Sequence, residues 1–199
     1  TASYMCSDGS TNSNINVATS GTYSVTVTDA ANGCTDQTSI TITESATAPV
    51  ASISSSETEL TCIVTDITLD ASGSTTTGTA SYEWSDGSTN NNINVTTAGT
   101  YSVTVTDAAN GCTDQTSITI TESATAPVAS ISSSETELTC TVTDITLDAG
   151  GSTTTGTASY EWSDGSTNNN INVTTAGTYA VTVTDAANGC TDETAVTIT

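Results

Sequence analysis

The sequence predicts an all-β chain built from tandem β-sandwich domains. Short segments alternate apolar and polar residues, as in 100–106, where Tyr101, Val103 and Val105 share one face. No stretch shows the period of 3.6 residues that is typical of an amphipathic helix. The third observation is an internal repeat, because Tyr-Glu-Trp-Ser-Asp-Gly occurs at 82–87 and again 78 residues later, at 160–165.

This repeat divides the chain into three units. Residues 44–121 and 122–199 differ at six of 78 positions, and residues 1–43 match 79–121 with five differences. We therefore expect two complete domains, at 44–121 and 122–199, preceded by the C-terminal part of a third at 1–43. Only 34% of the residues are apolar, which suits several small cores better than a single large one.

The strands of each unit are predicted from apolar alternation between turn residues. In the copy at 44–121, the Asn110-Gly111 pair predicts the turn of a hairpin, and glycines separate the other runs. About seven short strands with frequent turns are typical of a β-sandwich. The expected strands are centred, in chain order, on Ala51 and Ile53; on Ile67, Leu69 and Ala71; on Tyr82 and Trp84; on Ile93 and Val95; on 100–106; and on Thr116, Ile118 and Ile120.

Three residues refine the prediction to an immunoglobulin-like sandwich. Trp84 lies where such a domain has its buried tryptophan on strand C, and residues 99–103, Gly-Thr-Tyr-Ser-Val, have the pattern of a tyrosine corner. Leu69 and Val103 take the places of the two cysteines of the usual central disulfide, so we expect a Leu–Val contact instead. The expected core residues of the two complete repeats are Leu69, Tyr82, Trp84, Tyr101, Val103, Leu147, Tyr160, Trp162, Tyr179 and Val181.

A longer motif ends each unit: G-T-Y-x-V-T-V-T-D-x-x-N-G-C-T, at 21–35, 99–113 and 177–191. With this motif the whole chain resembles the PKD-like and immunoglobulin-like repeats of giant surface proteins in the Bacteroidetes, particularly repeats of the gliding-motility adhesin type. The resemblance implies a repeat segment of a long extracellular protein. The first unit departs from the pattern, since Met5-Cys6 replaces the Glu-Trp of the other units. A cysteine does not fill the volume of a tryptophan, so we expect a defective core or a different neighbour there.

Each complete repeat carries two cysteines, in a chain whose polar composition suggests an oxidising, extracellular setting. The simpler hypothesis pairs Cys62 with Cys112 and Cys140 with Cys190, within each domain. The alternative follows from sandwich topology, which brings the bottom of one domain to the top of the next and would pair Cys62 with Cys190. Cys34 lacks a partner in either scheme. A redox CxxC motif is absent, and the spacing does not suit zinc.

The charge excludes several functions. With 22 Asp and Glu and no Lys, Arg or His, the formal charge is −22, which excludes phosphate-backbone binding and lysine or histidine catalysis. No apolar run is long enough to span a membrane. The recurring carboxylates are typical of turns that cap their own backbone. Alternatively, Asp107, Glu122 and Asp185 could bind calcium at the domain junctions, because calcium prefers oxygen ligands.

We interpret the sequence as a non-enzymatic stalk segment of a long extracellular surface protein, which holds a distal adhesive part away from the cell. Its partners would be neighbouring repeats of the same chain. The sequence is compatible with two alternatives. The chain could be a subunit of a self-assembling extracellular filament, in contact with other copies, since its strand edges lack Lys. It could also be an adhesin module that binds glycan or protein through its loops, although its aromatic residues lie on expected core strands.

Overall fold

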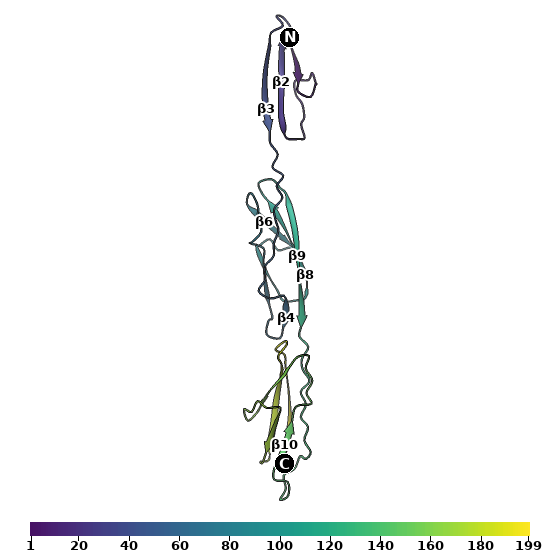
Figure 1. Ribbon diagram of the computed structural model, residues 1–199, viewed down its shortest axis with the longest axis vertical. Coiled ribbons are helices and arrows are strands. Elements are labelled where there is room, and N and C mark those ends of the chain that lie inside the picture. Colours follow the sequence, from purple (N-terminus) through teal and green to yellow (C-terminus); the bar gives the residue numbers. More distant parts are fainter.

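The computed structural model describes all residues, 1–199, as three β-units that follow one another along the long axis (Figure 1). We call residues 1–43 the first unit, residues 44–121 the second domain and residues 122–199 the third domain. The chain contains fourteen strands and no helix, which confirms the predicted all-β, immunoglobulin-like class. No segment forms a helix long and apolar enough to cross a lipid bilayer.

The second domain is a sandwich of two sheets. One sheet has four strands in the order β4-β9-β8-β6, and the other pairs β5 with β7. The sheets are antiparallel except that the short β4 runs parallel to the end of β9. The strand bounds are β4 Glu59–Thr61, β5 Ile67–Asp70, β6 Ala80–Trp84, β7 Asn92–Val95, β8 Gly99–Asp107 and β9 Thr113–Ser123.

The third domain repeats this arrangement. A three-stranded sheet in the order β11-β13-β14 faces the pair β10-β12. The register is conserved between the copies, since Trp84 lies opposite Val103 and Trp162 lies opposite Val181. The strand bounds are β10 Ile145–Asp148, β11 Ala158–Trp162, β12 Asn170–Val173, β13 Gly177–Asp185 and β14 Thr191–Ile198.

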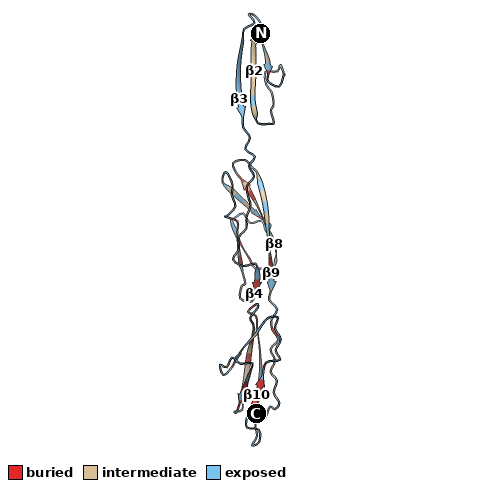
Figure 2. Ribbon diagram, in the orientation of Figure 1, coloured by how far each residue is buried: buried red, intermediate tan, exposed pale blue.

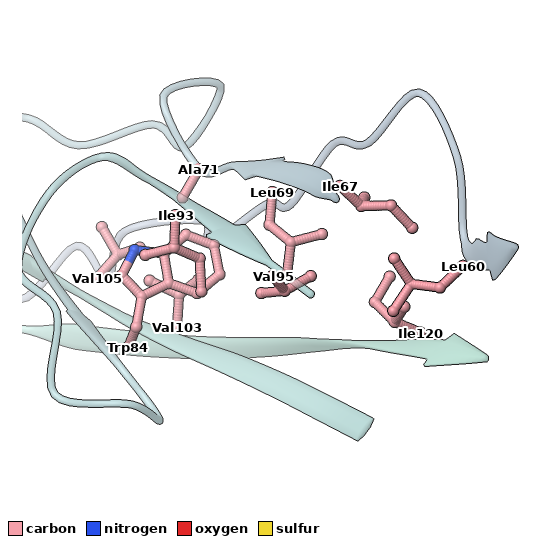
Figure 3. Close-up of a cluster of buried hydrophobic side chains, with 10 residues drawn as sticks. All are labelled: Leu60, Ile67, Leu69, Ala71, Trp84, Ile93, Val95, Val103, Val105 and Ile120. Atoms are coloured by element: carbon pink, nitrogen blue, oxygen red, sulfur yellow. The ribbon is translucent and has the colours of Figure 1, made fainter. Parts of the chain in front are cut away.

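Each complete domain has its own hydrophobic core between the two sheets (Figure 3). In the second domain, Leu69 and Val103 are fully buried, Trp84 is 2% exposed, and Tyr82 and Tyr101 pack against the cluster at its edge. Leu69 and Val103 enter this core from opposite sheets, where an immunoglobulin domain would place its disulfide. In the third domain the corresponding residues, Leu147, Tyr160, Trp162, Tyr179 and Val181, are placed in the same way.

The tyrosine corner is present in all three units. The phenol of Tyr101 donates a hydrogen bond to the backbone oxygen of Thr97, at 2.9 Å. Tyr23 and Tyr179 make the same bond to the residue four positions upstream. This bond ties the start of the long strand to the loop before it, as expected for an immunoglobulin-like sandwich.

The first unit is a single sheet rather than a sandwich. Its strands β1 (Ala2–Cys6), β2 (Gly21–Asp29) and β3 (Thr35–Ile42) pair in that order, and no second sheet covers them. Figure 2 shows the consequence, because β2 is only half-buried and β3 is exposed along its length. Cys6, at the position of Trp84, is 7% exposed, whereas Met5 is 62% exposed.

Candidate functional site at the domain junction

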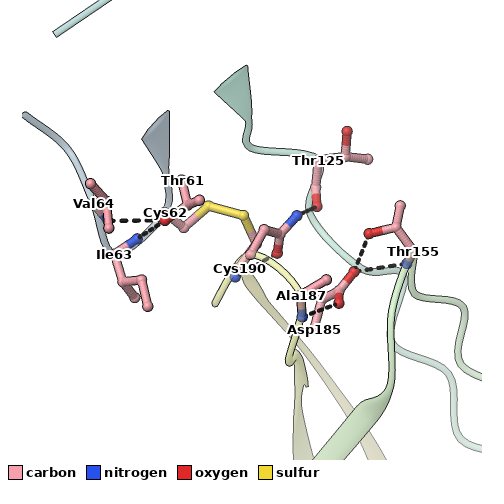
Figure 4. Close-up of a disulfide and its surroundings, with 10 residues drawn as sticks. Thr61, Cys62, Ile63, Val64, Thr125, Thr155, Asp185, Ala187 and Cys190 are labelled. Atoms are coloured by element: carbon pink, nitrogen blue, oxygen red, sulfur yellow. Dashed lines mark hydrogen bonds between the residues drawn. A yellow bond between two sulfur atoms is a disulfide. The ribbon is translucent and has the colours of Figure 1, made fainter. Parts of the chain in front are cut away.

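The second and third domains are joined by a disulfide between Cys62 and Cys190, with the two Cα atoms 5.0 Å apart (Figure 4). Cys62 follows β4 at the lower end of the second domain, and Cys190 precedes β14 at the upper end of the third. The prediction of pairs within each domain, Cys62–Cys112 and Cys140–Cys190, is therefore wrong, and the junction pairing is the one found. Cys112 and Cys140 are free, as are Cys6 and Cys34.

The physical reason lies in the topology of one domain. Cys62 lies beside β4, which pairs with residues 121–123 at the end of β9. Cys112 lies at the other end of the same strand, just before Thr113. A strand of this length separates its two ends by roughly 35 Å, at about 3.3 Å per residue. Two cysteines at opposite ends of a sandwich cannot be bridged, since a disulfide requires Cα atoms within about 7 Å.

The loop that carries Cys62 is a preformed turn. The side-chain oxygen of Thr61 accepts hydrogen bonds from the amides of Ile63 and Val64, and the Thr61 amide donates to the Val64 oxygen at 2.9 Å. In the equivalent turn of the third domain, the Thr139 side-chain oxygen accepts from the amides of Thr141 and Val142, and the Thr139 amide donates to the Val142 oxygen, although Cys140 is exposed and free. The turn therefore presents its cysteine whether or not a disulfide forms.

On the other side of the junction, Asn188 connects three segments. Its side-chain oxygen accepts from the Cys190 amide at 2.9 Å, and its side-chain nitrogen donates to the Thr125 oxygen at 3.0 Å. Its backbone oxygen accepts from the Cys62 amide at 3.2 Å, across the junction. Asn188 thus holds the interdomain linker, the turn before β14 and the neighbouring domain together.

The second domain provides an internal comparison, because it has the same Asn-Gly turn with no neighbour docked on it. Asn188 is 1% exposed in the junction, whereas its equivalent Asn110 is only half-buried. Both turns place glycine at positive φ, 70° for Gly189 and 73° for Gly111. A Cβ at Gly189 would lie 2.7 Å from the Ile63 side chain, but one at Gly111 would meet no atom within 4 Å. The close contact between Gly189 and Ile63 therefore arises from the docking of the two domains at the junction.

The carboxylate of Asp185, at the end of β13, fastens the same turn to its own domain. It is fully buried and accepts hydrogen bonds from the amides of Ala187, Thr155 and Gly156 and from the Thr155 hydroxyl. These donors, the Thr155 hydroxyl first and the Ala187 amide next, favour the ionised form and lower the pKa of Asp185 to about 2. Asp107 makes the corresponding contacts with Thr77, Gly78 and Ala109, and its pKa is lowered for the same reasons.

These contacts do not fit the hypothesis of calcium at Asp107, Glu122 and Asp185. The oxygens of Asp107 and Asp185 face N–H and O–H donors, whose partial positive charges would repel a cation. Glu122 is exposed on β9, and no group of three or more acidic, cysteine or histidine side chains comes together as a metal site. The two aspartates act on the backbone, as the turn alternative predicts.

We expect the third domain to lose stability in acid through Asp185. Because its folded-state pKa is depressed, its contribution is complete above its ordinary pKa of 3.8 and is lost as the pH falls through about 2. Thermal unfolding followed by circular dichroism between pH 5 and 2 measures the loss. Asp185→Asn should reduce the pH dependence, whereas Asp164→Asn, which removes the same charge from an exposed turn, should retain it. Equal profiles for the two variants would contradict this role.

Comparisons with known proteins assign neither a family nor a function to the chain. No protein-family model matches the sequence, and no curated protein matches it. The chain is similar to the three N-terminal domains of the bacteriophage RB49 outer capsid protein Hoc, with 20% identity and a TM-score of 0.41 over 76% of this chain. It is also similar to Sidekick-1 immunoglobulin domains 1–5, with 12% identity and a TM-score of 0.37 over 100% of this chain.

A third similar structure is the BSP domain of a biofilm-associated protein, with 11% identity and a TM-score of 0.26 over 90% of this chain and 42% of that one. The chain spans 59% of the Hoc structure and 53% of the Sidekick-1 structure. Such low identities and TM-scores carry no information about activity or partners. The resemblance to Bacteroidetes surface-protein repeats thus stays a prediction.

Proposed function

We propose that the chain is a structural, non-enzymatic segment of a long extracellular surface protein, and that it acts as a stiff rod that holds another part away from the cell. The observation that carries this proposal is the disulfide between consecutive domains, Cys62–Cys190. A disulfide of this kind persists in an oxidising compartment, which supports an extracellular location. The end-to-end order of the units supports an elongated shape (Figure 1).

The stiffness follows from the number of attachments at the junction. Domains connected by one short linker normally reorient, because interfaces within a chain are small. Here the backbone linker is one attachment, and the disulfide is a second. The hydrogen bond from Asn188 to Thr125 also fixes the linker itself. Two covalent attachments at separate points restrict bending far more than one does, so the second and third domains should move as one body.

Residual dipolar couplings of the full 199-residue chain test this proposal. In the oxidised protein, the second and third domains should share one alignment tensor. In the double variant Cys62→Ser/Cys190→Ser, the tensors should diverge, because the linker is then the only covalent connection between the domains and the remaining junction contact is small. Cys112→Ser is the matched control, since it removes a free cysteine and should leave the tensors equal. Divergent tensors in the oxidised parent would contradict the rod, and equal tensors in the double variant would show that packing rather than the disulfide provides the stiffness.

A further inference from the structure

The junction contains a chemically reactive pair of residues, Asn188-Gly189. An asparagine followed by glycine is prone to spontaneous deamidation, because glycine has no side chain to keep its backbone nitrogen away from the asparagine side chain. The same pair occurs in the other two units, at 110–111 and 32–33. The glycine has a positive φ in all three turns, but the asparagine is buried only at position 188.

The deamidation reaction needs only water. The backbone nitrogen of Gly189 attacks the side-chain carbonyl carbon of Asn188, forms a C–N bond and loses its proton, and the side-chain nitrogen leaves as ammonia. Water then opens the cyclic succinimide at either of its two carbonyl groups. One product has an aspartate at position 188, and the other has an isoaspartate, in which the main chain runs through the former side-chain carbon.

Hydrogen bonds hold both reacting groups in the docked junction. The Gly189 amide donates to the backbone oxygen of Asp185 at 2.7 Å. The Asn188 side chain is held at both ends, because its oxygen accepts from the Cys190 amide and its nitrogen donates to the Thr125 oxygen. Ring closure requires the side chain to leave these bonds and water to enter, so it requires a local opening of the turn.

The second domain shows which part of this protection is local. The Gly111 amide donates to the Asp107 oxygen at 2.7 Å, and the Asn110 side chain bonds the Cys112 amide and the Thr47 oxygen. These bonds are the same as in the third domain, yet this turn is only half-buried. The additional protection at the junction therefore comes from the docked neighbour.

We propose that Asn188 is a latent modification site, which the disulfide Cys62–Cys190 protects and which deamidates once the junction opens. The disulfide holds the neighbour in place directly over this turn, where the Cys62 amide donates to the Asn188 backbone oxygen at 3.2 Å and Ile63 lies against Gly189. Without the disulfide, the linker and a small contact remain, so the turn opens more often. The inference concerns the junction of the proposed rod, but it does not depend on how stiff the rod is.

Deamidation of Asn188 should prevent the junction from closing again. The Asn188 side-chain nitrogen donates to the Thr125 oxygen at 3.0 Å, and a carboxylate has no proton to donate there. The product also brings a negative charge into a site that is 1% exposed, in a turn that already holds the buried carboxylate of Asp185. A temporary loss of the disulfide would thus become a permanent change, because the product does not return to asparagine.

The experiment follows deamidation of the full chain over days at neutral pH, with and without a thiol reductant. Samples are then denatured, reduced and digested with chymotrypsin, which cleaves after tyrosine and leucine, and mass spectrometry measures the replacement of the amide by a carboxyl group. The peptide 180–199 carries Asn188 and has a sequence of its own. The peptides 24–60 and 102–138 carry the other two Asn-Gly pairs, are identical in sequence and serve together as the internal reference.

In the oxidised parent, Asn188 should deamidate at least about tenfold more slowly than the reference. In the reduced parent and in Cys62→Ser/Cys190→Ser, its rate should approach that of the reference, whereas the control Cys112→Ser should retain the slow rate. A slow rate at Asn188 in the double variant, or a rate equal to the reference in the oxidised parent, would overturn the proposal. The alignment tensors of freshly prepared protein test the rod separately, so failure of one idea is not mistaken for failure of the other.

A second measurement tests whether the product blocks closure. Asn188→Asp mimics one product, and Asn110→Asp adds the same charge to the turn without a docked neighbour. In a glutathione buffer, Asn188→Asp should lower the equilibrium constant for forming Cys62–Cys190 by at least about tenfold, because a hydrogen bond is lost and a charge is buried. Asn110→Asp should match the parent. Trp162 fluorescence checks that the third domain is folded, and parent protein aged under reductant gives the same readout without a substitution. Equal constants for the two variants, or for aged and fresh parent, would refute the block.

Discussion

Replacing Trp84 by alanine should destabilise the second domain by about 3–5 kcal/mol, the usual cost of removing a buried aromatic side chain. The indole lies between the two sheets, is 2% exposed, and donates its N–H to the Asn90 oxygen, so the variant loses both packing and a hydrogen bond. A domain of this size has a total stability of about 5–15 kcal/mol, so the loss is a large fraction of it. Trp162 remains as a reporter of the third domain.

Fluorescence and circular dichroism during thermal unfolding measure the effect. The second domain should melt well below the third. The disulfide between the two domains does not replace the packing that the second domain loses. Ser117→Ala is the matched control, because residue 117 is exposed and the third domain already carries alanine at the equivalent position, 195. If Trp84→Ala and Ser117→Ala melt at similar temperatures, the core role of the tryptophan is wrong.

The sandwich could be predicted from the sequence because its determinants are local. Apolar alternation predicts a strand at 100–106, and the structure places β8 at Gly99–Asp107. The residues that identify the immunoglobulin-like type are equally local. The corner bond joins residues only four positions apart, Thr97 and Tyr101, and Trp84 is recognised from its own short strand segment.

The disulfide pairing could not be chosen from the sequence because it depends on how two domains meet. The number of cysteines is compatible with both Cys62–Cys112 and Cys62–Cys190. The pairing Cys62–Cys112 closes the shorter loop and therefore is the simpler hypothesis. The deciding fact is that Cys112 lies at the opposite end of the sandwich from Cys62. Asn188 was missed for a related reason. Its sequence context is the same as that of Asn110, and only the neighbouring domain distinguishes them.

The aspartates show a different limit of sequence interpretation. Asp107 and Asp185 occupy the same position in their repeats, and an aspartate that recurs in this way suits both a turn and a metal site. The choice depends on what faces the carboxylate oxygens, and amide and hydroxyl donors face them in the structure. Because these donors come from residues about thirty positions earlier, as with Thr155 and Asp185, no local motif reveals them.

Under tension applied to its two ends, the oxidised chain should extend far less than the reduced chain. Cys62 and Cys190 are 128 residues apart in sequence, so the disulfide excludes that loop from the load-bearing path. Breaking the bond should release a further ~420–460 Å of extended chain, at about 3.3–3.6 Å per residue. Single-molecule force spectroscopy with and without reductant measures this difference. The double variant Cys62→Ser/Cys190→Ser should behave as the reduced chain does, and Cys112→Ser as the oxidised one.

The same bond determines which parts of each domain resist the force. In the oxidised chain, the load enters the second domain through the linker before Val50 and leaves at Cys62, so most of that sandwich carries no tension. In the third domain the load passes from Cys190 along β14 only, whose pairing with β13 resists it. We therefore expect short extensions before the bond is broken and two whole-domain unfolding events after it. Whole-domain events of full length in the oxidised chain would mean that the disulfide does not carry the load between the domains.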